Sequence, residues 1–190
     1  MGWLGRILVS ELIILAMDVS GSMRATDVLP NRITAAQEAA KTFIAALPRQ
    51  VRVGVVSFAG TAAVVQAPTL SRDDVAAAID RFQLQRGTAV GSGILVSLKM
   101  LFPDAEFDLR SSNPRRDAAK GAPLDPARPS DKEKEKAAPK PVAPGSFQSA
   151  AIILLTDGQT TTGPDPIESA RIAADRGVRV YTVGIGTQGG

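Results

Sequence analysis

LIILAMDVSGS, residues 12–22, joins an uninterrupted apolar run to a polar turn that carries one carboxylate and two hydroxyls. The apolar run is typical of a central strand that is covered on both faces. Asp18, Ser20 and Ser22 occupy alternate positions of the turn, so their oxygens can converge on one point. Because open α/β sheets place their binding crevices at the carboxyl ends of strands, the turn is a candidate metal site.

A second apolar run, residues 149–156, also ends at an aspartate, Asp157. Further strands are predicted at 51–58, at 62–66 as an antiparallel hairpin partner, and at 178–183. Helices are predicted from Asn31 to Leu47, from Ser71 to Phe82, over 89–101, and from Asp165 to Gly177, on the basis of capping residues and apolar positions three and four apart.

This alternation predicts a doubly wound, Rossmann-like α/β fold: a mostly parallel sheet with one antiparallel edge strand and helices on both faces. The strands 12–19 and 149–156 should flank the switch point of the sheet, so Asp18 and Asp157 should face each other there. A chain of 190 residues with 44% hydrophobic content is enough for one domain, residues 1–190.

Residues 103–148 break the pattern. They hold eight of the thirteen prolines and the charge run 131–136, with almost no apolar residues between Leu124 and Val142. Such a composition cannot offset its ordering entropy, so we interpret 103–148 as a disordered insertion within the domain.

Composition excludes several classes of function. The chain has no cysteine and no histidine, which excludes a thiolate nucleophile, a Ser-His-Asp triad and nearly all zinc hydrolase chemistry. Its 22 basic and 19 acidic residues are interspersed, so a nucleic-acid partner is not favoured. The apolar stretch 7–17 is well short of the ~20 residues that span a bilayer, and we expect this chain itself to be soluble.

Two more oxygen-bearing residues complete the candidate site. Thr88 lies in a glycine-flanked loop before the third predicted helix, and Asp157 ends the fourth strand. With Asp18, Ser20 and Ser22 they supply five oxygens and neither nitrogen nor sulfur, which selects a hard ion such as Mg²⁺, Mn²⁺ or Ca²⁺. Magnesium fits best, because a few protein oxygens and waters complete its octahedron.

Together these motifs, Asp18 to Met23, Thr88 in its Gly-Thr loop, and Leu155 to Gly158, resemble the metal-ion-dependent adhesion site (MIDAS) of von Willebrand factor A (VWA) domains. Residues 25–32, 53–60 and 182–187 are similar, more narrowly, to the bacterial Bat-type (aerotolerance-operon) membrane proteins. The resemblance implies that Ser20, Ser22 and Thr88 bind the metal directly, and that Asp18 and Asp157 act directly or through water.

The same resemblance implies a function without catalysis. An ion held largely by neutral hydroxyls keeps much of its charge, so an open coordination position attracts a Glu or Asp carboxylate of a protein partner. In the family, movement of the last helix reports this binding. A MoxR-type AAA+ ATPase or its client is the first candidate partner, and no small-molecule substrate is expected.

Relatives continue with another helix, a strand and a C-terminal helix, and Bat-type proteins carry membrane spans. We therefore expect a C-terminally incomplete domain of a membrane-associated protein.

Four alternatives stay open at this point. The Asp18 turn could be a purely structural cap, or the site could be dead in a scaffold. Asp18 could be the nucleophile of a Mg²⁺-dependent phosphotransferase or hydrolase, although position 20 is Ser where a second acid is needed. Residues 184–189 match Gly-x-Gly-x-x-Gly, but no helix follows to make a dinucleotide site.

Overall fold

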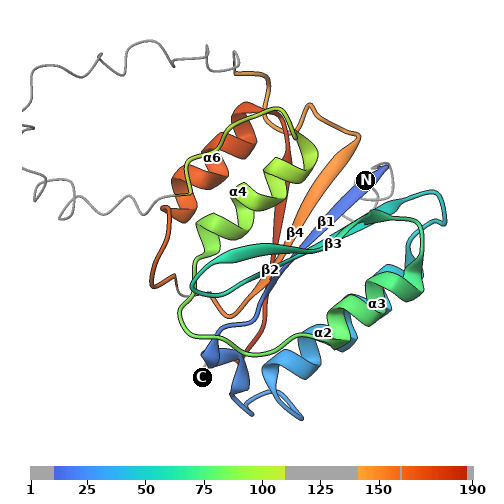
Figure 1. The fold of residues 1–190 in the computed structure, drawn as a ribbon, viewed down its shortest axis with the longest axis vertical. Helices are drawn as coiled ribbons and strands as arrows, with labels where there is room; N and C mark the ends of the chain where they lie inside the picture. The colour runs from blue at the N-terminus through green and yellow to red at the C-terminus, as the bar shows by residue number, and fades with distance from the viewer. Residues whose placement is uncertain (1–10, 110–140, 159, 188–190) are drawn as a thin grey trace, which may run out of the picture.

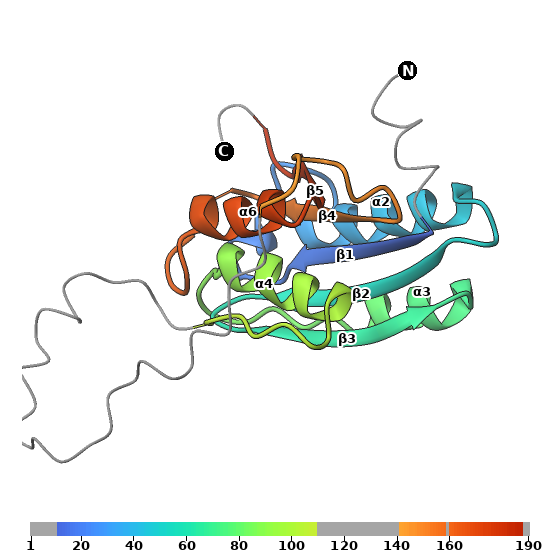
Figure 2. The same cartoon turned by 90° about the horizontal axis from the view of Figure 1, so that it is seen from above.

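One five-stranded sheet forms the centre of the molecule. The computed structural model describes residues 11–109, 141–158 and 160–187. Its strands, in the order β3-β2-β1-β4-β5, can be followed in Figure 2. Strand β1 is parallel to β2 and β4, β4 is parallel to β5, and only β3 runs antiparallel, against β2. The strand bounds are β1 (Leu12–Asp18), β2 (Arg52–Phe58), β3 (Ala62–Thr69), β4 (Ala150–Thr156) and β5 (Arg179–Gly184).

Helices cover both faces of this sheet (Figure 1). Helices α2 (Arg32–Ala46) and α3 (Arg72–Asp80) lie on one face, and α4 (Val90–Leu101) and α6 (Pro166–Asp175) lie on the other. A short 3₁₀ helix, η1 (Gly21–Arg24), follows β1. The predicted fold class, a mostly parallel doubly wound sheet with one antiparallel edge strand, is confirmed.

Alternation along β1 divides the core into two halves. Ile13, Leu15 and Met17 pack with α2 and α3, whereas Ile14 and Ala16 pack with α4 and α6. All five side chains are fully buried. Because both faces of β1 are covered, the strand is apolar from Leu12 to Met17, and the buried Asp18 at its end is the exception.

Capping side chains begin the helices where the sequence places them. Asn31 accepts a hydrogen bond from the backbone N–H of the third residue of α2, and Ser71 and Asp165 do the same for α3 and α6. Each cap satisfies one of the N–H groups that a helix start leaves unpaired. The α2 cap has a functional consequence, because it fixes Arg32 as the first residue of that helix.

The switch point lies between β1 and β4. From β1 the chain continues to β2 and β3 on one side, and β4 and β5 lie on the other. The last paired residues of β1 and β4 are Met17 and Leu155. Asp18 and Asp157 therefore follow adjacent strand ends, as predicted, and the loops after β1, before α4 and after β4 meet there.

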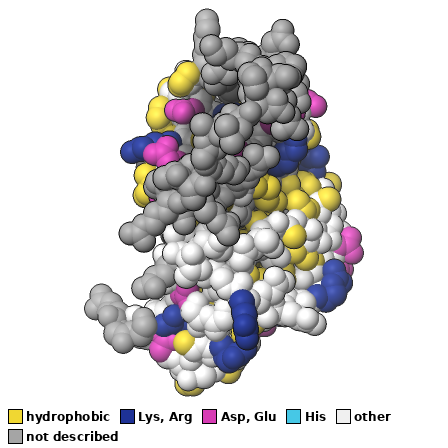
Figure 3. Space-filling view, turned by 60° about the vertical axis from the view of Figure 1, so that its left-hand side comes forward, with side chains coloured by type: hydrophobic (Ala, Val, Ile, Leu, Met, Phe, Trp, Pro, Cys, Tyr) yellow, Lys and Arg dark blue, Asp and Glu magenta, His cyan; other side chains and the backbone are white. Residues whose placement is uncertain are grey.

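The predicted insertion is described only at its two ends. Residues 110–140 lie outside the described residues, and at the ends Phe107 and Phe147 pack against the α4–α6 half of the core. Within the described ranges, no helix has the length and apolarity that crossing a bilayer requires. Figure 3 shows one face on which basic and acidic side chains are interspersed, in agreement with a mixed surface.

Candidate metal centre

Asp18, at the end of β1, is fully buried beneath the candidate site. Its Oδ1 accepts a hydrogen bond from the backbone N–H of Ser20 at 2.8 Å, and its Oδ2 accepts one from the Thr156 hydroxyl at 2.7 Å. Burial raises the pKa of Asp18 above its usual value; the hydrogen bonds oppose this rise and the nearby charge of Asp157 adds to it. The ionised carboxylate is therefore costly in this fold without a cation nearby.

The two serine hydroxyls lie next to each other. Ser20 Oγ and Ser22 Oγ are 2.9 Å apart. An octahedral Mg²⁺ with metal–oxygen distances of about 2.1 Å places neighbouring ligand oxygens about 3 Å apart. Ser20 is the N-cap residue of η1, yet its side chain makes no capping hydrogen bond. The two hydroxyls are hydrogen-bonded to each other at a spacing that a shared ion also requires, and the Ser20 hydroxyl does not cap the turn. The Asp18 carboxylate bonds to that turn instead.

Thr88 is held in place by its backbone. Its N–H donates to Thr161 Oγ1 at 2.9 Å, and its carbonyl accepts from Thr161 N–H at 2.8 Å and from the Thr160 hydroxyl at 3.0 Å. Gly87 precedes it with φ +78°, and a Cβ there would lie 3.0 Å from the Cα of Gly60. These contacts fix the loop through its main chain, so the Thr88 side chain is available to a ligand.

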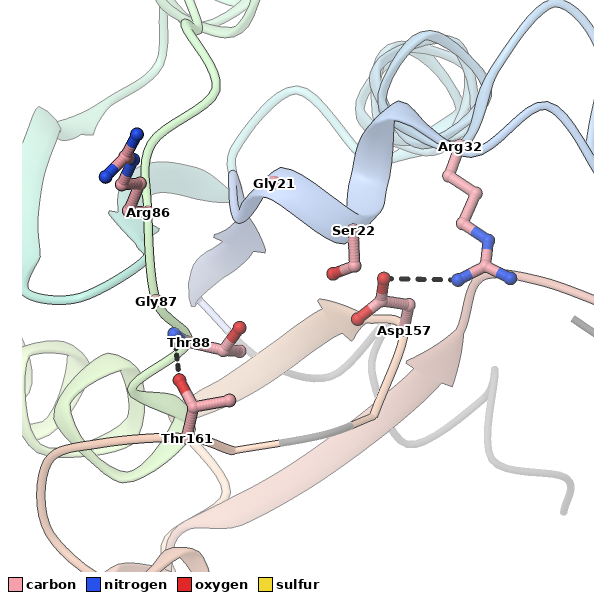
Figure 4. A pocket seen from close by; sticks show the side chains of 8 residues that line it. All are labelled: Gly21, Ser22, Arg32, Arg86, Gly87, Thr88, Asp157 and Thr161. Carbon is pink, nitrogen blue, oxygen red and sulfur yellow. Dashed lines mark hydrogen bonds and ion pairs between the residues drawn. The ribbon is translucent and has the colours of Figure 1, made fainter.

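A pocket of about 500 Å³ opens at this point (Figure 4). Three of the five predicted ligands, Ser22, Thr88 and Asp157, line it, while Asp18 and Ser20 lie beneath, 0% and 1% exposed. Figure 4 shows the Asp157 carboxylate between the Ser22 hydroxyl and the Arg32 guanidinium. The full lining is Gly21, Ser22, Arg32, Arg86, Gly87, Thr88, Asp157 and Thr161.

Three contacts of the site were not predicted from the sequence. Arg32 donates from Nη1 to Asp157 Oδ2 at 3.2 Å, Thr156 donates to Asp18, and Thr161 holds the loop of Thr88. Arg32 belongs to a stretch that carries the Bat-type resemblance, but an arginine in the first turn of a helix is normally read as a surface charge. The sequence gives no signal that pairs it with a residue 125 positions away.

The donor set suits a hard cation. Among the residues that the structure describes, no three side chains of His, Cys, Asp or Glu gather into a group that could hold a metal. A metal here would depend on hydroxyl oxygens together with Asp18 and Asp157. Such ligands fit Mg²⁺, Mn²⁺ or Ca²⁺ and are poor ligands for soft metals.

Fold and pocket together define an open α/β domain with an oxygen-rich pocket at its switch point. The chain belongs to the von Willebrand factor type A domain family, whose model matches residues 13–118. This match confirms the family expected from the motifs.

Curated relatives extend beyond this chain. The chain is 36% identical over 182 residues to a UPF0353 protein of Mycolicibacterium gilvum, covering 93% of the chain and 44% of the relative. It is 34% identical over 186 residues to a UPF0353 protein of Nocardia farcinica, covering 94% of the chain and 46% of the relative. The chain thus spans less than half the length of these relatives.

Solved structures share the fold. BatB of Bacteroides thetaiotaomicron superposes with a TM-score of 0.61 at 24% identity, covering 91% of this chain and 65% of that one. An aerotolerance-related membrane protein of Bacteroides fragilis superposes with a TM-score of 0.62 at 20% identity, covering 92% of this chain and 67% of that one. Proximal thread matrix protein 1 from the mussel byssus, with a zinc-occupied MIDAS motif, superposes with a TM-score of 0.60 at 20% identity. It covers 95% of this chain and 37% of that one.

Proposed function

We propose that this chain is a metal-ion-dependent protein-interaction module. It holds one divalent cation with Asp18, Ser20, Ser22, Thr88 and Asp157, and binds a Glu or Asp carboxylate of a protein partner through that ion. The proposal rests mainly on one observation: Ser22, Thr88 and Asp157 meet in one pocket above the buried carboxylate of Asp18. Mg²⁺ is our first choice of ion; the zinc-occupied MIDAS of the byssus protein supports a divalent ion without selecting magnesium.

Charge favours a carboxylate as the partner group. The ion would have two carboxylates near it, and one of them, Asp157, is shared with Arg32. The remaining donors are neutral hydroxyls, and Arg32 draws on part of the Asp157 charge, so the two carboxylates compensate the charge of a bound dication only in part. An anionic side chain is the ligand that gains most from such a position.

The wider setting of the module is also a proposal. A MoxR-type AAA+ ATPase or its client is the partner to test first, and we place the full-length protein at a membrane. The Bat-type resemblance supports both, and the structural neighbour from Bacteroides fragilis is named as a membrane protein.

We infer that the site is not catalytic. The lining of the pocket contains no lysine, and its only carboxylate, Asp157, is paired with Arg32. A phosphotransferase that uses Asp18 would need an exposed nucleophile, yet Asp18 is fully buried. An assay with a generic aryl phosphate and Mg²⁺ should give no turnover above that of Asp18→Ala; turnover that depends on Asp18 would favour the enzyme instead.

Partner capture tests the function. The immobilised chain is incubated with extract in Mg²⁺ or in EDTA, beside a Ser20→Ala/Ser22→Ala double variant, and retained proteins are quantified by mass spectrometry. We expect at least one protein that is retained only by the wild type and only in Mg²⁺. Equal retention by the double variant would indicate a scaffold with a dead site.

Arg86 should assist the approach of an acidic partner. Its carbonyl accepts from Gly60 N–H at 2.9 Å, and its side chain is exposed at the pocket without a hydrogen bond or ion pair to any described residue. Arg86→Glu should slow association of the captured partner about tenfold at low salt, with a smaller difference at high salt. Surface plasmon resonance measures both rates.

Arg49→Glu is the matched control for Arg86. Arg49 is exposed and precedes β2, at the amino ends of the parallel strands and so opposite the pocket. The same change of charge there should leave association unaltered. Equal slowing by both variants would mean that net charge, and not the position of Arg86, is responsible.

A further inference from the structure

The Arg32 guanidinium is shared unequally between two carboxylates. It donates from Nε and Nη2 to the two oxygens of Asp27 at 2.7 and 2.8 Å, and from Nη1 to Asp157 Oδ2 at a longer 3.2 Å. The Arg32 side chain is 9% exposed and that of Asp157 is 4% exposed. The forked contact thus goes to Asp27, which lies outside the lining of the pocket, and Asp157 receives one weaker contact.

This division leaves one oxygen of the Asp157 carboxylate, Oδ1, available to bind an ion. No described residue donates a hydrogen bond to its Oδ1, and Figure 4 shows the carboxylate turned toward the side of the pocket where Ser22 lies. Arg32 thereby holds the carboxylate by one oxygen while the other is open to an ion. In this role Arg32 is a positioning residue.

A positive charge beside a dication nevertheless needs compensation. Arg32 and a bound metal ion repel each other, and both attract the same Asp157 carboxylate. Asp27 offsets the charge of Arg32 through its forked contact. In agreement with this tight pairing, the Arg32 guanidinium holds the pKa of Asp27 far below its usual range.

We propose that Asp27 sets the metal affinity of the site from outside it, by keeping Arg32 from taking the Asp157 carboxylate away from the ion. This inference rests on the proposed function, because it assumes that a divalent ion binds at Asp157. Asp27 also accepts hydrogen bonds from the backbone N–H and the hydroxyl of Thr187, after β5. The same carboxylate therefore ties the segment after β5 to the metal site.

Asp27→Asn tests the proposal. The isosteric amide removes the negative charge, so Arg32 is left with Asp157 as its one carboxylate and should form a forked contact with it. We expect Mn²⁺ affinity, measured by electron paramagnetic resonance of the free ion, to fall about tenfold. Thermal unfolding followed by circular dichroism verifies that the variant is folded at the temperature of the titration.

Adding Arg32→Gln should reverse the loss. Without the guanidinium there is no competitor for Asp157, so the Asp27→Asn/Arg32→Gln double variant should bind Mn²⁺ several-fold more tightly than Asp27→Asn and within about threefold of Arg32→Gln alone. A purely structural role for the pair would not produce this pattern, because two lost contacts do not restore binding.

The outcomes separate this inference from the proposed function. If the wild type binds Mn²⁺ no better than Asp18→Asn, both fail together. If the wild type binds but Asp27→Asn is equal to it, or the double variant stays as weak as Asp27→Asn, only the role of Asp27 is overturned.

Discussion

Replacing Asp18 with asparagine is expected to abolish divalent-metal binding and, at the same time, to make the metal-free protein more stable. The loss of binding follows from removing one of two carboxylates near the ion, in a buried setting where charge interactions are strong. An affinity lower by on the order of 100-fold or more is expected in a calorimetric titration of Mg²⁺ or Mn²⁺. Equal weak heats for both proteins would refute the site.

The gain in stability follows from the raised pKa of Asp18. Burial penalises the ionised carboxylate in the folded state, so the folded pKa lies above the unfolded value of 3.8. Wild-type stability therefore falls as pH rises from the unfolded pKa through the folded one, and the penalty persists at neutral pH. Asparagine carries no charge and avoids this loss, and its oxygen can still accept from Ser20 N–H.

Thermal unfolding in EDTA at several pH values measures this effect. The melting temperature of Asp18→Asn should lie above that of the wild type at pH 7, and this difference in melting temperature should shrink as the pH approaches 4. Saturating Mg²⁺ should raise the melting temperature of the wild type alone. A variant that melts below the wild type at every pH would show that the carboxylate supports the fold by its own hydrogen bonds.

Gly91→Ala is expected to be the most damaging single-methyl change in the domain. Gly91 lies in the first turn of α4, and a Cβ there would come within 2.2 Å of the Pro164 carbonyl oxygen and 2.8 Å of Ser169 Oγ. Helix propensity alone would favour alanine by about 1 kcal/mol. We expect a net loss of about 2 kcal/mol in the free energy of unfolding, because α4 and α6 must move apart. Urea denaturation measures the change.

Gly184→Ala is the matched control. Gly184 ends β5, and a Cβ there would meet no atom within 4 Å. The free energy of unfolding should stay within about 0.5 kcal/mol of the wild type. A stable Gly91→Ala protein would mean that the contact between α4 and α6 is looser than the structure shows.

Much of the fold follows from the sequence because its signals are local. The uninterrupted apolar runs of β1 and β4 report burial on both faces, and Asn31, Ser71 and Asp165 cap the helices that they were predicted to begin. Strand β3 was predicted to end at Gln66 but continues to Thr69. It is an edge strand with register shifts against β2, and such a strand tolerates Pro68 and lacks a clean alternation of apolar residues.

The site was predictable where its residues end strands. Asp18 and Asp157 follow the two apolar runs, and the order of the strands brings them together. The contact of Arg32 with Asp157 and Asp27 depends on side-chain directions in three separate segments, which spacing along the chain does not encode. The assignment of the five residues as metal ligands stays a prediction.

An anomalous difference map from crystals grown with Mn²⁺ would show directly whether an ion binds in the pocket. We expect one strong peak in the pocket, about 2.0–2.3 Å from Ser22 Oγ and within the reach of Thr88 and Asp157, directly or through one water. The peak should be absent from crystals of Asp18→Asn. A map without a peak at this pocket, or with a peak only elsewhere on the protein, would show that the five residues do not hold an ion.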